Sequence, residues 1–120
     1  MIVGVGLDVV DIARWAQNLE NIQAQIFTAR ELAACADRAD RIDALAARFA
    51  AKEACIKALG AGIRDGALRQ IEITSNGGPP EVQLTGALLE RARERGVRST
   101  HVSLTHQEGI AAAMVVLEGA

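Results

Sequence analysis

Three charged residues in apolar surroundings are the strongest candidates for chemistry in this sequence. Asp8 interrupts an apolar, β-branched segment at residues 2–10. Glu53 and Lys57 are four residues apart in a helix-like segment at 41–59, so they can face one site together. Two carboxylates from separate elements can hold a divalent cation, while nearby cations neutralise phosphate oxygens. The pattern predicts a site for a divalent metal and a phosphate ester.

A structural explanation of the helical charges stays open. Glu53 and Lys57 could form a surface salt bridge, with lysine side chains extending along apolar surface to water. Lys52 falls inside the apolar stripe of the same helix, and Glu53 lies at its edge. Because an unpaired buried charge is costly, we expect both residues to have partners. The presence of Asp8 on a separate strand favours the metal site over a surface salt bridge.

Two elements must position these residues. Residues 2–10 predict an interior strand, apolar on both faces, whose even positions include Gly4, Gly6 and Asp8. The glycine face has little side-chain bulk, and Asp8 stands on it. Residues 41–59 predict a long helix, with Gly60 as its C-cap.

Shorter elements are predicted around this pair. Asp11 is a suitable N-cap for a helix beginning at Ile12, and Thr28 has capping-box spacing to Glu31. Both faces of the last strand are apolar, so in a small domain we expect another subunit to cover one of them. The second half predicts strands at 70–74 and 81–84, a helix at 86–95, and a hairpin of strands 101–106 and 110–117.

Composition limits the classes of function. The chain has 120 residues, and we expect residues 1–120 to form a single domain. A net charge of −2 and very few aromatic residues argue against a nucleic-acid partner. The sequence shows no membrane-spanning apolar run and no signal-peptide start. Cys35 and Cys55 are not spaced as a C-x-x-C pair, so we expect buried thiols and a cytoplasmic location.

The sequence resembles one family over nearly its whole length. Residues 49–60, FAAKEACIKALG, closely resemble the phosphopantetheinyl transferase signature F/W-x-x-K-E-A-x-x-K-A-x-G. Residues 2–10 are similar to the G-x-G-x-D-[IV] start of its short, holo-acyl-carrier-protein-synthase branch. Other matches follow in order at Ile12-Ala13-Arg14, Phe27-Thr28-x-x-Glu31, Gly60-x-Gly62-Ile63-Arg64-x-Gly66, Ile71-Glu72-Ile73, Gly78-x-Pro80 and Ser103-Leu104-Thr105-His106.

The resemblance implies a fold and an activity. The fold is α+β, with an antiparallel sheet packed against a long helix. The assembly is a homotrimer with active sites at subunit boundaries. The activity is magnesium-dependent transfer of the 4′-phosphopantetheine arm of coenzyme A to a serine of apo-acyl carrier protein. Adenosine 3′,5′-bisphosphate is the second product.

The resemblance also implies roles by position. Asp8 and Glu53 become metal ligands and catalytic residues, and Glu53 is the candidate for accepting the serine proton. Lys57 becomes a catalytic residue that contacts the pyrophosphate. Arg14 becomes part of the helix that receives the carrier protein. The other implied coenzyme A contacts are Arg48, Gly60, Arg64 and His106.

Alternatives remain for several of these assignments. Arg64 lies in a segment that reads equally as a turn after the helix, and Gly60 reads first as a C-cap. The arginines at 91–98 predict a solvated face. For the whole chain, the alternative is a non-catalytic coenzyme A or carrier-protein binding module of the same fold, against which the intact carboxylates and lysine argue.

Overall fold

The computed structural model describes residues 1–62, 67–75 and 77–120. Arg64, predicted as a coenzyme A contact, lies outside the described residues. In chain order the elements are β1 (Ile2–Asp11), α1 (Ile12–Ala16), α2 (Leu19–Ile26), α3 (Ala29–Cys35), α4 (Arg41–Leu59), the 3-10 helix η1 (Ala67–Gln70), β2 (Ile71–Thr74), β3 (Glu81–Leu84), α5 (Gly86–Glu94), β4 (Ser99–Gln107) and β5 (Ile110–Glu118).

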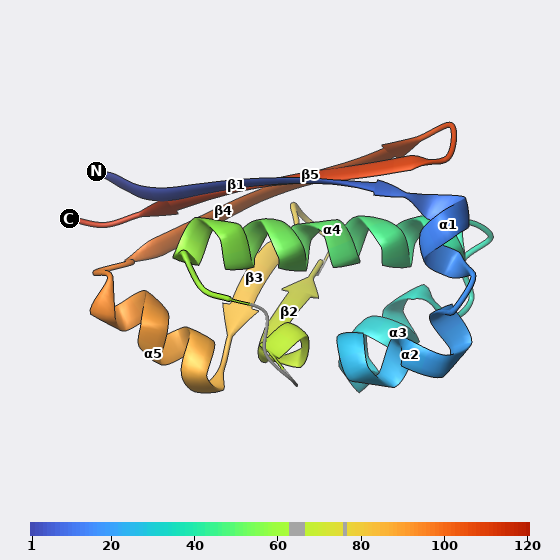
Figure 1. Cartoon of the computed structure of the whole chain (residues 1–120), viewed down its shortest axis with the longest axis horizontal. Helices are drawn as coiled ribbons and strands as arrows, with labels where there is room; N and C mark the ends of the chain where they lie inside the picture. Colours follow the sequence, from blue (N-terminus) through green and yellow to red (C-terminus); the bar gives the residue numbers. More distant parts are fainter. Residues whose placement is uncertain (63–66, 76) are drawn as a thin grey trace.

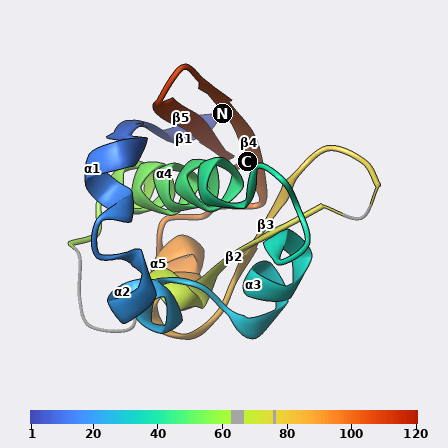
Figure 2. The same ribbon diagram turned by 90° about the vertical axis from the view of Figure 1, so that its right-hand side faces the viewer.

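Helix α4 lies between two layers of the molecule (Figure 1). On one side is a three-stranded antiparallel sheet in the order β1-β5-β4, and on the other is the β2-β3 hairpin. The view along α4 shows α1 and α2 beside one flank of the helix, with α3 nearer the other (Figure 2). The predicted α+β fold, with an antiparallel sheet against a long helix, is confirmed.

Small residues on both elements let β1 and α4 pack very closely. An ideal Cβ at Gly4 would lie 2.1 Å from the Ala58 carbonyl oxygen, and one at Gly6 would lie 1.7 Å from the Ala54 carbonyl oxygen. Any side chain at either glycine would therefore collide with the α4 backbone. Asp8 follows on the same face of β1, so this contact also fixes where its carboxylate lies.

The prediction that β1 is an interior strand is wrong for the single chain. β1 is an edge strand, and α4 covers only its glycine face. The opposite face leaves Val5, Leu7 and Val9 between 55% and 60% exposed. On neighbouring β5, Ile110 and Met114 are also nearly half exposed. We call these five residues the outer apolar face.

Local signals near the N-terminus are largely confirmed. Asp11 caps α1 by accepting a hydrogen bond from the Arg14 backbone N–H, and Thr28 and Glu31 form the predicted capping box. The helix that begins at Ile12 ends at Ala16, and α2 then forms a second short helix. Among the described residues, no helix is both long and apolar enough to cross a membrane.

Two arginines of the α5 region are not part of a solvated face, which corrects the prediction for residues 91–98. Arg95 donates hydrogen bonds of 2.8 Å to the carbonyl oxygens of Leu59 and Val3. Arg91 also donates to Leu59, at 3.1 Å. The last carbonyl groups of a helix have no partner within it, so these arginines cap α4. Arg93, which forms an exposed pair with a glutamate, fits the prediction.

Candidate active site

Asp8 and Lys57 meet where β1 crosses α4. The Lys57 Nζ lies 3.1 Å from the Asp8 Oδ1 and donates a 3.0 Å hydrogen bond to the Leu7 carbonyl oxygen. Glu53 lies one helical turn before Lys57 on the same face of α4 and is half-buried. The structure thus brings together the three residues that the sequence predicts as the centre of the site.

The carboxylates of Asp8 and Glu53 are partly buried, and the charge of Asp8 affects Glu53. Burial raises the pKa of the Glu53 carboxyl, and the negative charge of Asp8 raises it further, while Lys57 lowers it. Two negative charges that repel each other favour the binding of a cation between them. Carboxylate oxygens are also the ligands that magnesium prefers. Among the described residues no cluster of three or more His, Cys, Asp or Glu side chains forms, so an ion here would complete its shell with water or substrate oxygens.

An open groove of about 580 Å³ adjoins this site. We call it the acidic groove. Arg14, predicted to bind a carrier protein, lies in its wall together with Asp8 and Glu53. Helix α1 therefore borders the same groove as the carboxylates. The groove is lined by Asp8, Val9, Val10, Asp11, Arg14, Trp15, Phe49 and Glu53.

Arg48 and His106 lie in a separate cavity of about 280 Å³, which Arg38 also lines. We call it the arginine pocket, defined by Arg38, Arg48 and His106. Arg48 is only 7% exposed, and among the described residues its Nε has no hydrogen-bond partner. Two guanidinium groups, one of them buried with an N–H group that has no partner among the described residues, can bind an anion beside the His106 ring.

The acidic groove and the arginine pocket lie on opposite flanks of α4. Asp8 is on β1 and His106 on β4, and β5 separates these strands. On α4, Arg48 and Lys57 are nine residues apart and point about 180° from each other. Within one chain the structure therefore does not bring Arg48 and His106 together with Asp8, Glu53 and Lys57.

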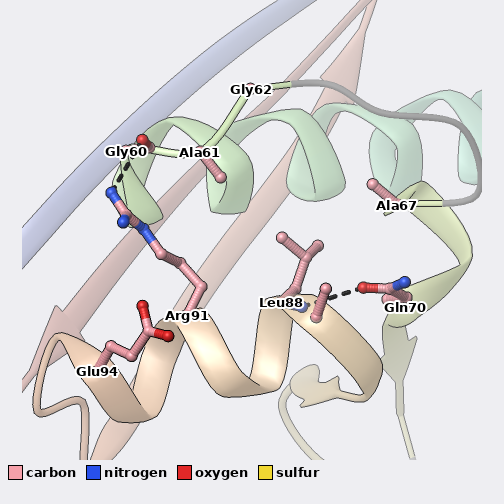
Figure 3. Close-up of a pocket in the computed structure, with 9 residues that line it drawn as sticks. Gly60, Ala61, Gly62, Ala67, Gln70, Leu88, Arg91 and Glu94 are labelled. Atoms are coloured by element: carbon pink, nitrogen blue, oxygen red, sulfur yellow. Dashed lines mark hydrogen bonds between the residues drawn. The ribbon is translucent and has the colours of Figure 1, made fainter.

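Gly60 ends α4 and lines a third cavity, of about 410 Å³ (Figure 3). Its φ of 66° is left-handed, and its N–H group bonds to the Ile56 and Lys57 carbonyl oxygens. The predicted C-cap is thus confirmed. Arg91 crosses from α5 and donates to the Gly60 carbonyl oxygen at 3.2 Å. Gly60 thus has a structural role, whatever ligand reaches the cavity.

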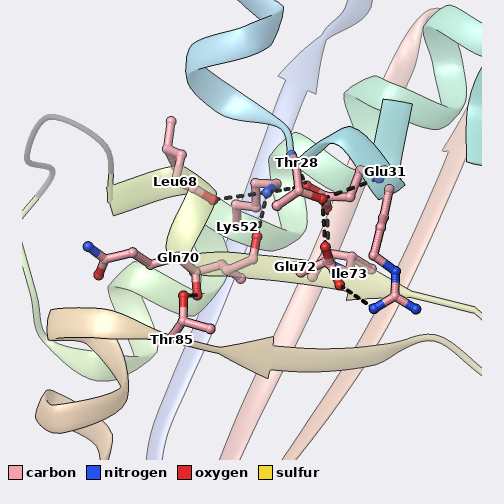
Figure 4. Close-up of polar contacts among 10 residues, drawn as sticks. Thr28, Glu31, Lys52, Leu68, Gln70, Glu72, Ile73 and Thr85 are labelled. Atoms are coloured by element: carbon pink, nitrogen blue, oxygen red, sulfur yellow. Dashed lines mark hydrogen bonds and ion pairs between the residues drawn. The ribbon is translucent and has the colours of Figure 1, made fainter. Parts of the chain in front are cut away.

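Lys52 is a structural residue in the middle of the motif (Figure 4). Its Nζ is fully buried and lies 2.6 Å from the Glu31 Oε1, and it also donates to the carbonyl oxygens of Leu68 and Ile71. The second oxygen of Glu31 accepts from the Ile73 N–H group at 3.0 Å. Burial lowers the pKa of Lys52, and the charge of Glu31 opposes that shift. This network fixes α3 and β2 to α4.

Sequence reasoning missed part of these arrangements. It explained Glu31 by its capping box and did not identify it as the partner of Lys52, although it expected such a partner. It also missed Arg38, Asp40 and Asp43, which surround His106. No motif marks these three residues, and their contacts depend on how the chain before α4 meets β4.

Comparison with known proteins identifies the family of the chain. The model of the 4′-phosphopantetheinyl transferase superfamily matches residues 4–115. The holo-acyl-carrier-protein synthase of Anaeromyxobacter dehalogenans is 43% identical over 99% of this chain and 98% of its own length. Crystal structures of such synthases are also similar. The Neisseria meningitidis protein has a TM-score of 0.87 at 34% identity, covering 98% of this chain and 99% of that one.

A further structure, of the Helicobacter pylori synthase in complex with coenzyme A, has a TM-score of 0.76 and 29% identity. It covers 95% of this chain and 99% of that one. The fold is that of holo-acyl-carrier-protein synthases, and in this chain a glycine-faced strand and a long helix bring Asp8, Glu53 and Lys57 together. The chain belongs to the 4′-phosphopantetheinyl transferase superfamily.

Proposed function

We propose that this chain is an enzyme that transfers the 4′-phosphopantetheine arm of coenzyme A to a serine of apo-acyl carrier protein. The products are holo-carrier protein and adenosine 3′,5′-bisphosphate. The observation that carries the proposal is the meeting of Asp8, Glu53 and Lys57 beside an open groove. Full-length similarity to holo-acyl-carrier-protein synthases supports the same reaction.

The residues at and beside the groove have separate tasks in this reaction. The serine hydroxyl attacks the phosphorus that carries the pantetheine arm, and the bond from that phosphorus to the bridging oxygen breaks. Lys57, whose side chain is 55% exposed, neutralises charge that grows on the leaving bisphosphate. Glu53, which lines the groove, accepts the serine proton.

Magnesium fits the donor set formed by Asp8 and Glu53. When bound, it would supply charge stabilisation for the pyrophosphate. Both carboxylates would hold it, each from a different element of the fold. The close packing of β1 on α4 supports this role because it fixes one ligand relative to the other.

We also propose that the enzyme is a homotrimer with its sites at subunit boundaries. The outer apolar face, with Leu7 60% and Met114 47% exposed, is a surface that copies of this chain can cover. The positions of the acidic groove and the arginine pocket, on opposite flanks of α4, support the same arrangement. A neighbouring subunit could place its arginine pocket beside the acidic groove, so that Arg48 and His106 contact coenzyme A held by Asp8, Glu53 and Lys57.

Arg14 has the position of a carrier-docking residue. It lies on α1, at the wall of the acidic groove, where a bound carrier would present its serine to Glu53. The carrier is an acidic protein by resemblance, so a cation here would favour its approach. We place the reaction in the cytoplasm, with which the buried free thiols of Cys35 and Cys55 agree.

Mass spectrometry of a carrier protein tests the proposal. Apo-acyl carrier protein is incubated with the chain, coenzyme A and magnesium, and a parallel sample contains a chelator. We expect the carrier to gain the mass of one phosphopantetheine group only when magnesium is present. An unmodified carrier, with coenzyme A bound to the chain, would instead support the non-catalytic binding module. Absence of coenzyme A binding would contradict both functions.

A further inference from the structure

Arg38 and His106 of the arginine pocket already lie beside carboxylates of the same chain. Arg38 donates to both carboxylate oxygens of Asp40, at 2.8 Å and 2.9 Å. The His106 Nε2 lies 3.5 Å from the Asp40 Oδ2, and its Nδ1 lies 3.6 Å from the Asp43 Oδ2. Two carboxylates therefore lie beside the pocket that contacts coenzyme A in the proposed function.

These partners are easily exchanged. The side chains of Arg38, Asp40, His106 and Asp43 are between 30% and 46% exposed, so each carboxylate can turn away into water. Partly exposed ion pairs are weak in water. A phosphate group carries more charge and more acceptor oxygens than a carboxylate, so it can replace one at a guanidinium group.

The pocket also has a donor that these carboxylates do not satisfy. Arg48 is buried, lines the pocket, and has an Nε without a hydrogen-bond partner among the described residues. A buried polar group without a partner is unfavourable. Asp40 and Asp43 therefore contact Arg38 and His106 and leave Arg48 for a ligand.

We propose that Asp40 and Asp43 are internal counter-anions of the arginine pocket, which a phosphate group of coenzyme A displaces from Arg38 and His106. The inference rests on the proposed function. The two carboxylates set the affinity for coenzyme A. They hold Arg38 and His106 in place before binding, and they oppose binding by competition and by like-charge repulsion.

A helix-capping role is the structural alternative for Asp40, which precedes the first residue of α4. Its side chain makes no capping hydrogen bond, because Arg38 holds both oxygens. Asp43 lies in the first turn of α4, where a negative charge is favourable. The capping role predicts that removing either charge lowers stability and leaves affinity unchanged. Displacement by phosphate predicts a higher affinity.

Isothermal titration calorimetry of coenzyme A with matched variants tests the inference. Asp40→Asn and Asp43→Asn each remove one negative charge beside His106. Asp37→Asn is the control, since Asp37 is an exposed neighbour that makes no hydrogen bond or ion pair within the described part of the chain. We expect Asp40→Asn to lower the Kd roughly threefold to fivefold, the size of an exposed ion pair. Asp43→Asn should act in the same direction, and the control should change the Kd less than about twofold.

Titration with dephospho-coenzyme A shows which phosphate group of coenzyme A binds in the arginine pocket. This ligand keeps the diphosphate and lacks the phosphate monoester on the ribose. If Asp40→Asn raises the affinity for coenzyme A alone, the pocket binds the phosphate monoester. If it raises the affinity for both ligands equally, the pocket binds the diphosphate. Equal effects of Asp40→Asn and Asp37→Asn, or weaker binding by both Asp40→Asn and Asp43→Asn, would overturn the inference. If the unchanged chain does not bind coenzyme A, the proposed function itself fails.

Discussion

An ideal Cβ at Gly6 would lie 1.7 Å from the carbonyl oxygen of Ala54, so β1 and α4 meet backbone to backbone. Ala54 directly follows Glu53, and Gly6 is two residues before Asp8 on the same face of β1. The contact that a side chain would break is therefore the contact that brings the two carboxylates together. Small residues at this crossing serve the site as well as the core.

Gly6→Ala should move β1 away from α4 and so separate Asp8 from Glu53. We expect the transfer activity to fall at least about tenfold and the free energy of unfolding to fall by about 1–3 kcal/mol, as in overpacked cores. Steady-state kinetics and urea unfolding measure the two effects. Gly78→Ala is the matched control, because an added Cβ there would have no atom of the described residues within 4 Å. Unchanged activity of Gly6→Ala would show that the site tolerates a wider spacing.

Loss of the Lys52 charge should lower stability, whereas loss of the Lys57 charge should lower transfer activity. Lys52→Met leaves Glu31 buried without its counter-ion, so we expect the free energy of unfolding to fall by about 3–5 kcal/mol. Lys57→Met changes a half-exposed side chain, so stability should stay near that of the unchanged chain while transfer activity falls. Denaturant unfolding and kinetics on both variants check this. A stable Lys52→Met would contradict the structural role of that lysine.

A charge on the outer apolar face should prevent assembly. Met114 is 47% exposed at the middle of β5, paired with Leu7 on β1 and Ser103 on β4. Met114→Glu would bury a carboxylate in a subunit interface, which is costly. We expect a trimer for the unchanged chain and a monomer for this variant in analytical ultracentrifugation. Gln83→Glu, at an exposed position of β3, should remain trimeric. A monomeric unchanged chain with full activity would rule out the trimer.

Local patterns in the sequence predicted the elements that hold the site. The α4 bounds at 41–59, the C-cap at Gly60 and the Thr28 capping box all match the structure. These features depend on residues within a turn or two of each other. Spacing also placed Glu53 and Lys57 on one face, and the glycines of β1 indicated which face carries Asp8.

Contacts between distant segments were not predicted. Glu31 pairs with Lys52 across 21 residues, and Arg95 bonds to Val3 across 92. Nothing in the local sequence around either residue specifies its partner. Helical geometry places Arg48 and Lys57 on opposite sides of α4. Whether they then belong to separate sites depends on which strands flank the helix. The exposure of Leu7 likewise depends on the outer face of the sheet being uncovered in the single chain, which local sequence does not determine.

The kcat/KM of transfer by Glu53→Gln tests the central claim most directly. The claim is that Glu53 and Asp8 together hold the metal and stabilise charge during transfer of phosphopantetheine to a carrier serine. We expect kcat/KM to fall at least about 100-fold, or about 2.7 kcal/mol in barrier, with an unchanged circular dichroism spectrum. Asp8→Asn should show the same loss, and Glu81→Gln, at an exposed position of β3, should show none. Magnesium-dependent transfer by Glu53→Gln at a rate near that of the unchanged chain would contradict the account.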